Sequence, residues 1–104
     1  MTIGDISRDS SGYTRVYDIY NNQIASGYIG QSDDDFYYSN TILVLRDYQG
    51  YTRVYDERLN QIASGYVGSG EDDCNVMGEN ILLRDSGGYK RIYDRFLNQI
   101  SSGY

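Results

Sequence analysis

The sequence predicts an all-β fold made of three tandem repeats. Three 21-residue units, 8–28, 46–66 and 84–104, align without a gap at a period of 38 residues, and 13 of the 21 positions are identical in all three. β-branched residues alternate with other residues inside each unit, a pattern that is typical of half-buried strands. Proline is absent, so the turns must be formed by Gly, Asn and Asp. We expect one repeat domain over residues 1–104.

Each unit is expected to be a three-stranded antiparallel meander. The first strands precede the units and carry Ile6, Val44 and Leu82. The first turns, 9–12, 47–50 and 85–88, begin with Asp and end with Gly, which is the preference of a type I turn. After the middle strand, a second turn runs from Asp to Asn at 18–22, 56–60 and 94–98, and the third strand follows.

Alternation within the strands predicts a core of three aliphatic residues per unit. The nine residues are Ile6, Val16, Ile24, Val44, Val54, Ile62, Leu82, Ile92 and Ile100. Fully burying each one stabilises the fold by about 1.5–3 kcal/mol, which is little for a monomer. We therefore expect the repeats to close with pseudo-threefold symmetry, as in a prism-like or trefoil-like fold, or to be completed by oligomerisation. An open solenoid and propeller blades completed by a second chain are the alternatives.

The Tyr-Asp pair of each unit, with Gly-x-x-Arg before it and Asn and a strand after it, resembles the hairpins of YD-type (RHS) repeats. The resemblance covers the three 21-residue units. Those repeats usually have glycine before the Asn, where this chain has Asn21, Leu59 and Leu97, and the period here is longer. The resemblance implies hairpins at these positions, and no function is carried over from it.

Composition excludes several classes of function. Histidine is absent, which excludes Ser-His-Asp and Cys-His catalysis, and the one cysteine, Cys74, cannot form an internal disulfide or a thiolate zinc cage. Neither spacer has the ligand spacing of a calcium loop. Three equivalent copies of one motif also argue against a single asymmetric catalytic centre. We expect a protein that is not an enzyme, without metal or cofactor, and cytoplasmic because no signal peptide or membrane span is evident.

The two spacers between the units, 29–40 and 67–79, carry a charge of −7, while the rest of the chain carries +1. The candidate binding residues in them are Asp33, Asp34, Asp35, Glu71, Asp72 and Asp73. We hypothesise that these acidic loops bind a protein partner with a basic surface, for example as an inhibitor of a nucleic-acid-handling machine. Direct binding of nucleic acid or membrane is disfavoured. The competing interpretation is a solvated loop that keeps a tyrosine-rich protein soluble.

A Tyr-x-Arg-x-Tyr face in each middle strand is the second candidate site. Its nine residues are Tyr13, Arg15, Tyr17, Tyr51, Arg53, Tyr55, Tyr89, Arg91 and Tyr93. These side chains could stack on sugars, which would make the protein lectin-like. Alternatively, each Arg packs between its tyrosines and pairs with a neighbouring Asp. A structural repeat that assembles with copies of itself is a further alternative.

Overall fold

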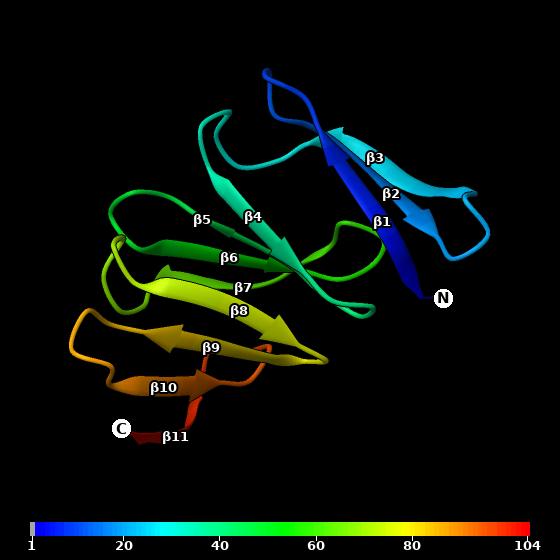
Figure 1. Ribbon diagram of the computed structural model, residues 1–104. Coiled ribbons are helices and arrows are strands. Elements are labelled where there is room, and N and C mark those ends of the chain that lie inside the picture. The colour runs from blue at the N-terminus through cyan, green and yellow to red at the C-terminus, as the bar shows by residue number, and fades with distance from the viewer. Residues whose placement is uncertain (1) are drawn as a thin grey trace.

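A computed structural model describes residues 2–104 as eleven antiparallel strands in three sheets (Figure 1). The predicted all-β class is confirmed, and residues 2–104 contain no helix. The first sheet contains three strands in the order β1 (Ile3–Arg8), β2 (Tyr13–Asp18) and β3 (Gln23–Tyr28). It is the meander that the sequence predicts for the first unit.

The second and third sheets each contain a fourth strand. The second sheet is β4 (Asp35–Tyr38), β5 (Leu43–Arg46), β6 (Tyr51–Tyr55) and β7 (Gln61–Tyr66). The third is β8 (Asp73–Met77), β9 (Asn80–Arg84), β10 (Lys90–Tyr93) and β11 (Gln99–Gly103). Because β4 and β8 lie inside the two spacers, the expectation that the spacers are loops holds only for their first parts.

The two turns of each unit form as the sequence predicts. In the first turns, the N–H groups of Gly12, Gly50 and Gly88 donate to the carbonyl oxygens of the Asp three residues earlier. These glycines have φ values of 86–89°, in the left-handed region that favours glycine. In the second turns, the residues before the Asn have positive φ as well, 67° at Asn21 and 64° at both Leu59 and Leu97. The position that is glycine in YD-type repeats is therefore left-handed here too.

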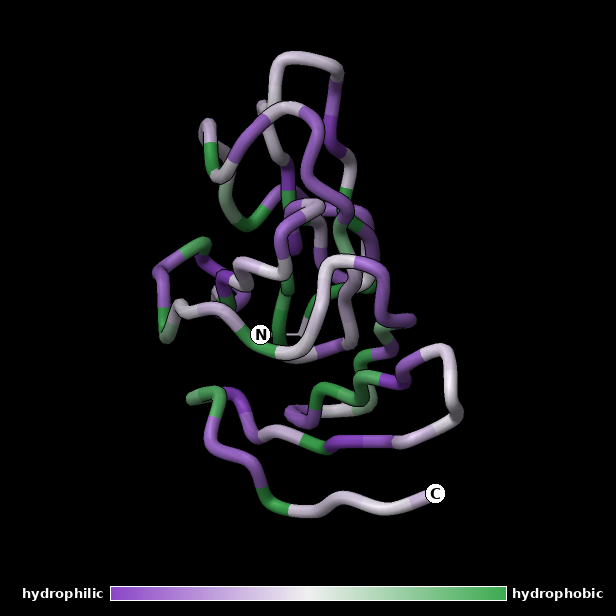
Figure 2. Tube along the Cα trace, turned by 90° about the vertical axis from the view of Figure 1, so that its left-hand side faces the viewer, coloured by the Kyte–Doolittle hydropathy of each residue, from purple (hydrophilic) through white to green (hydrophobic). Residues whose placement is uncertain are grey.

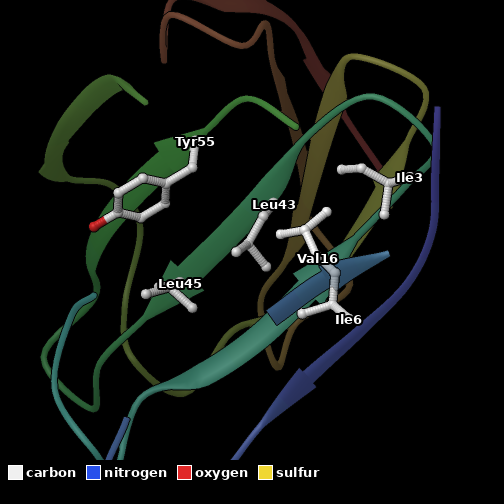
Figure 3. Packing of buried hydrophobic residues seen from close by; sticks show 6 residues of the cluster. All are labelled: Ile3, Ile6, Val16, Leu43, Leu45 and Tyr55. Carbon is white, nitrogen blue, oxygen red and sulfur yellow. The ribbon is translucent and has the colours of Figure 1, made fainter. Parts of the chain in front are cut away.

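The three sheets pack face to face in an open row. One apolar cluster joins the first sheet to the second through Ile3, Ile6 and Val16 on one side and Leu43, Leu45 and Tyr55 on the other (Figure 3). A second cluster joins the second sheet to the third through Ile42, Val44, Val54, Ile81, Leu83 and Tyr93. The molecule is elongated, with extents of 40 × 25 × 19 Å. Within residues 2–104 the predicted closure around an axis is not seen.

This packing explains how the predicted core differs from the observed one. Ile6, Val16, Val44 and Val54 are buried as expected. The second sheet has neighbours on both faces, so Leu43 and Leu45 are buried as well, on the face opposite Val44. Ile24, Ile62, Leu82 and Ile92 are half-buried. The prediction is wrong for Ile100, which is 55% exposed.

The outer face of the first sheet is polar at positions whose equivalents in the second sheet are apolar. At the positions of Leu43, Leu45 and Leu59, one period earlier, the chain has Asp5, Ser7 and Asn21. All three are exposed. This face of the first sheet thus carries side chains suited to water, together with the half-buried Tyr17, which lies opposite Asp5.

The outer face of the third sheet is polar at only some of the positions where the equivalent face of the second sheet is buried. At the positions of Tyr37, Ile42 and Thr52, one period later, the chain has Asn75, Asn80 and Lys90. Leu82, Ile92 and Ile100 still lie on this face and leave an apolar stripe. In Figure 2, no long apolar stretch runs along the chain trace, and no helix within residues 2–104 has the length and apolarity to cross a membrane.

Candidate interaction surface

The fold brings the first turns and the spacer loops to the same edge of the three sheets. The N–H of Ile29 donates to the carbonyl of Gly12 at 3.4 Å, and that of Val67 donates to the carbonyl of Gly50 at 3.1 Å. These bonds fasten each spacer beside the first turn of the preceding unit. We call this edge the acidic rim; it comprises 9–12, 29–35, 47–50, 67–73 and 85–88, which follow one another along one side of the molecule in Figure 1.

The six spacer carboxylates predicted to bind a partner divide into two groups. Asp33, Asp35, Glu71 and Asp73 are exposed on the rim. Asp34 is buried, and Asp72, at the equivalent position one period later, is half-buried. Four of the predicted residues therefore face solvent, while the other two lie in the folded part of the loops.

Asp34 and Asp72 hold the spacer loops in shape. Asp34 accepts a hydrogen bond from the N–H of Gln31 at 2.8 Å, and Asp72 accepts one from the N–H of Ser69 at 2.9 Å. Asp34 also pairs with Arg53, with Nη1 and Oδ2 3.6 Å apart and the Asp34 side chain only 1% exposed. Its Oδ1 is buried without a hydrogen-bond partner among the described residues. Its main role is to fold the loop and to connect it with the second sheet.

Arg8 and Arg46, which directly precede the first turns, do not neutralise the rim carboxylates. Arg8 donates to Thr14 Oγ1 at 2.8 Å, to the carbonyl of Ile29 at 3.0 Å and to that of Gln31 at 2.8 Å. Arg46 makes the equivalent three bonds in the second sheet. These guanidinium groups bind carbonyl and hydroxyl oxygens and thereby hold the spacer loops in place. Within residues 2–104 neither of them forms an ion pair with an exposed rim carboxylate.

The Asp residues of the first turns add to this negative charge. The carboxylate of Asp9 accepts hydrogen bonds from the side chain and backbone N–H of Ser11 and from the N–H of Tyr13, and these bonds lower its pKa. Asp47 and Asp85 accept the equivalent backbone bonds. A lowered pKa keeps the Asp9 carboxylate ionised to more acidic pH than an ordinary aspartate.

The Tyr-x-Arg-x-Tyr faces do not form exposed sugar platforms. Tyr55 and Tyr93 are only 5% and 6% exposed, because they pack into the clusters between sheets, and Tyr17 is half-buried. The three arginines lie over the first tyrosine of each face, with the guanidinium carbon of Arg15 4.7 Å from the ring centre of Tyr13. Within residues 2–104 the ion pairs are Arg53–Asp34 and Arg95–Glu79, so the expected pairing with neighbouring Asp residues does not occur.

A third tyrosine of each unit is exposed, and the sequence pattern did not single it out. Tyr28 and Tyr66 end the third strands of their units and Tyr104 directly follows the third, with exposed fractions of 73%, 70% and 90%. Each makes an edge contact with the first tyrosine of its own unit, with ring centres 4.9–5.0 Å apart. Their identity in all three copies was visible in the sequence, but their exposure depends on the position of the outer strands.

The described residues offer little for metal or thiol chemistry. Residues 2–104 bring no group of three His, Cys, Asp or Glu side chains together that could hold a metal ion. Burial raises the pKa of the Cys74 thiol to about 11. At neutral pH this thiol is therefore protonated and a poor nucleophile.

Comparison with known proteins shows a similarity of fold alone. No protein-family model and no curated protein matches the chain. Among solved structures, the chain is similar to the crystal structure of the computationally designed Ika8 protein, with a TM-score of 0.63 and 14% sequence identity. The match covers 94% of this chain and 32% of the Ika8 chain, so this chain spans about a third of that protein.

Proposed function

We propose that this protein is a non-enzymatic interaction protein whose acidic rim binds a basic surface of a macromolecular partner. The observation that supports this is the gathering of both spacers and all three first turns on one edge. Exposed carboxylates from two different spacers, Asp33 and Asp35 with Glu71 and Asp73, thereby lie on the same edge of the sheets. The period of 38 residues gives the two spacers equivalent positions on it.

The charge of the rim favours a partner rich in Lys and Arg. The whole chain has a net charge of −6, so it attracts cationic surfaces and repels nucleic acid and anionic membranes. A row of carboxylates could occupy the phosphate sites of a nucleic-acid-handling protein, and inhibition of such a protein is the specific form of the hypothesis. Binding would weaken steeply with added salt, because exposed charges are screened within about 10 Å at 0.1 M salt.

The experiment compares two double variants against a decalysine peptide as the probe. Asp33→Asn with Glu71→Gln removes two exposed rim charges at equivalent positions. Glu57→Gln with Glu79→Gln lowers the net negative charge by the same amount at the opposite edge, although Glu79 pairs with Arg95, and serves as the control for net charge. We expect the rim variant to bind about 3- to 10-fold more weakly in low salt and the control to bind as the parent does. Equal weakening in both variants would show that net charge alone acts and would overturn the rim proposal.

Completion of the row by a second copy is a second candidate. It is supported by the apolar stripe of Leu82, Ile92 and Ile100 on the outer face of the third sheet, which no other sheet of residues 2–104 covers. Sedimentation at micromolar concentration tests it, because self-association requires a mass well above the 11.9 kDa of one chain.

A further inference from the structure

Most positions that are identical in the three units have a structural role. Gly12 has positive φ, Asp9 and Asp18 accept backbone hydrogen bonds in the turns, and Arg8 fastens the spacer. Three identical positions lack such a role, and all of them lie in the third strands or, for Tyr104, directly after one. They are Gln23, Gly27 and Tyr28, with their copies Gln61, Gly65, Tyr66, Gln99, Gly103 and Tyr104.

The glycine of these strands is not required by the fold. A Cβ added at Gly27 or Gly65 would meet no atom within 4 Å, and neither residue has a positive φ. Glycine inside a strand weakens it and often marks a place where another molecule approaches the backbone closely. Gly103 also faces open space but differs from the other two, because its φ of 158° is one that other residues rarely adopt. Each outer strand therefore keeps a bare stretch of backbone beside its exposed tyrosine.

The exposed tyrosine is held in place by its neighbours. In the first sheet, the Tyr13 hydroxyl donates to Ser26 Oγ at 2.9 Å, and Arg15 lies over the Tyr13 ring. The edge contact of Tyr28 with Tyr13 then fixes one side of the Tyr28 ring and leaves the rest in solvent. The third sheet repeats this arrangement, with Tyr89 donating to Ser102 Oγ at 3.0 Å. Such a preorganised aromatic surface loses little conformational entropy on binding.

We propose that the outer strands β3, β7 and β11 carry three equivalent platforms for a neutral polysaccharide. The apolar face of a pyranose ring would stack on Tyr28, Tyr66 or Tyr104, because tyrosine offers an apolar ring with a polar tip. The glycine before each tyrosine faces the opposite side of the strand and leaves the edge backbone accessible there. The exposed amide of Gln23 or its copies lies five residues away along the same strand, where it can bond hydroxyls of another sugar of the polymer. This moves the sugar site away from Tyr55 and Tyr93, which are buried between sheets, and from Tyr17, which is half-buried on the outer face of the first sheet.

The repetition and the charge together select the class of ligand. A polymer of identical units can occupy several identical platforms at once, which raises its avidity without any new contact. The net charge of −6 disfavours acidic glycans and other polyanions. The platforms are independent of the acidic rim, so either site could be shown without the other.

Sedimentation with insoluble neutral polysaccharides tests the proposal. The set includes cellulose, a β-1,3-glucan, xylan and amylose, and the parent protein should be retained by at least one of them. The triple variant Tyr28→Ala, Tyr66→Ala, Tyr104→Ala should lose that affinity by about tenfold or more, and a single replacement should lose less. The triple replacement by Phe should retain most of the binding, because stacking needs the ring.

Two controls make the result specific. Tyr20 and Tyr48 are 78% and 79% exposed but lie in turns outside the repeated pattern, so Tyr20→Ala with Tyr48→Ala should bind as the parent does. The rim variant Asp33→Asn with Glu71→Gln should also keep its polysaccharide binding. Circular dichroism melts verify that each variant is folded. Failure of the parent to bind any of the four polysaccharides, or equal losses in the turn control, would overturn the proposal.

Discussion

The second and third sheets contain the same arginine in two different environments. Arg46 is 3% exposed and donates to Thr52 Oγ1 at 2.7 Å, to the carbonyl of Val67 at 3.0 Å and to that of Ser69 at 2.7 Å. Arg84, one period later, is exposed, and Lys90 stands where Thr52 would be. An arginine that is identical in two copies of the repeat can therefore have different structural roles, because its environment depends on the segment that follows it.

The spacers explain this difference. Arg8 and Arg46 both bind carbonyl groups of the spacer that leaves their own sheet. Arg84 is exposed, and within residues 2–104 it donates no hydrogen bond to such a carbonyl group. The replacement of Thr by Lys at position 90 fits the same change, since a cation is tolerated on a face that meets water.

The largest effect is expected from the two neighbouring leucines of β9. Leu83 is 2% exposed in the cluster between the second and third sheets, whereas Leu82 lies half-buried on the outer face. Leu83→Ala should lower the free energy of unfolding by about 2–5 kcal/mol, and Leu82→Ala should lower it by clearly less. Urea unfolding of both variants measures this. Equal losses would mean that the outer face of the third sheet is covered in solution.

The arginine pair should give the next largest difference. Arg46→Ala removes charged hydrogen bonds to three buried or half-buried oxygens, which should lower the free energy of unfolding by about 1.5–3 kcal/mol or more. Arg84→Ala, the matched control, should change it by no more than about 0.5 kcal/mol. Thermal and urea unfolding measure both. A large loss for Arg84→Ala would contradict the exposure of this side chain.

The sequence predicts strands, turns and repeat boundaries well because these depend on local chemistry. The Asp-to-Gly and Asp-to-Asn turns form hydrogen bonds within four or five residues, so the local sequence is enough to predict them. The burial of Leu43, Leu45 and Tyr55 could not be derived in the same way, because it depends on a neighbouring sheet that is remote in the sequence. For the same reason the predicted six-residue acidic site includes Asp34, whose burial follows from packing against the second sheet.

The strands inside the spacers were missed for a related reason. Asp35 and Asp73 begin β4 and β8, and both sequences read as acidic loops because their alternation is short and their two copies differ. What specifies these strands is pairing with β5 and β9, in which Asp35 lies opposite Arg46 and Asp73 opposite Arg84. Each spacer is thus a loop followed by the first strand of the next sheet.

The smallest expected effect on stability concerns one turn position with left-handed φ, which is Asn21 in the first sheet and Leu59 in the second. Leu59 has a φ of 64° and packs on the first cluster, so its burial offsets the strain of a leucine in this conformation. Asn21 has a φ of 67° and faces solvent, and asparagine tolerates this conformation well. Asn21→Leu should therefore lower the free energy of unfolding by about 1 kcal/mol, since the strain would come without burial. Leu59→Asn should cost a similar amount through lost packing, and Asn21→Gly should be close to neutral. Urea unfolding resolves differences of this size, and a stabilising Asn21→Leu would show that the outer face of the first sheet is covered by another surface.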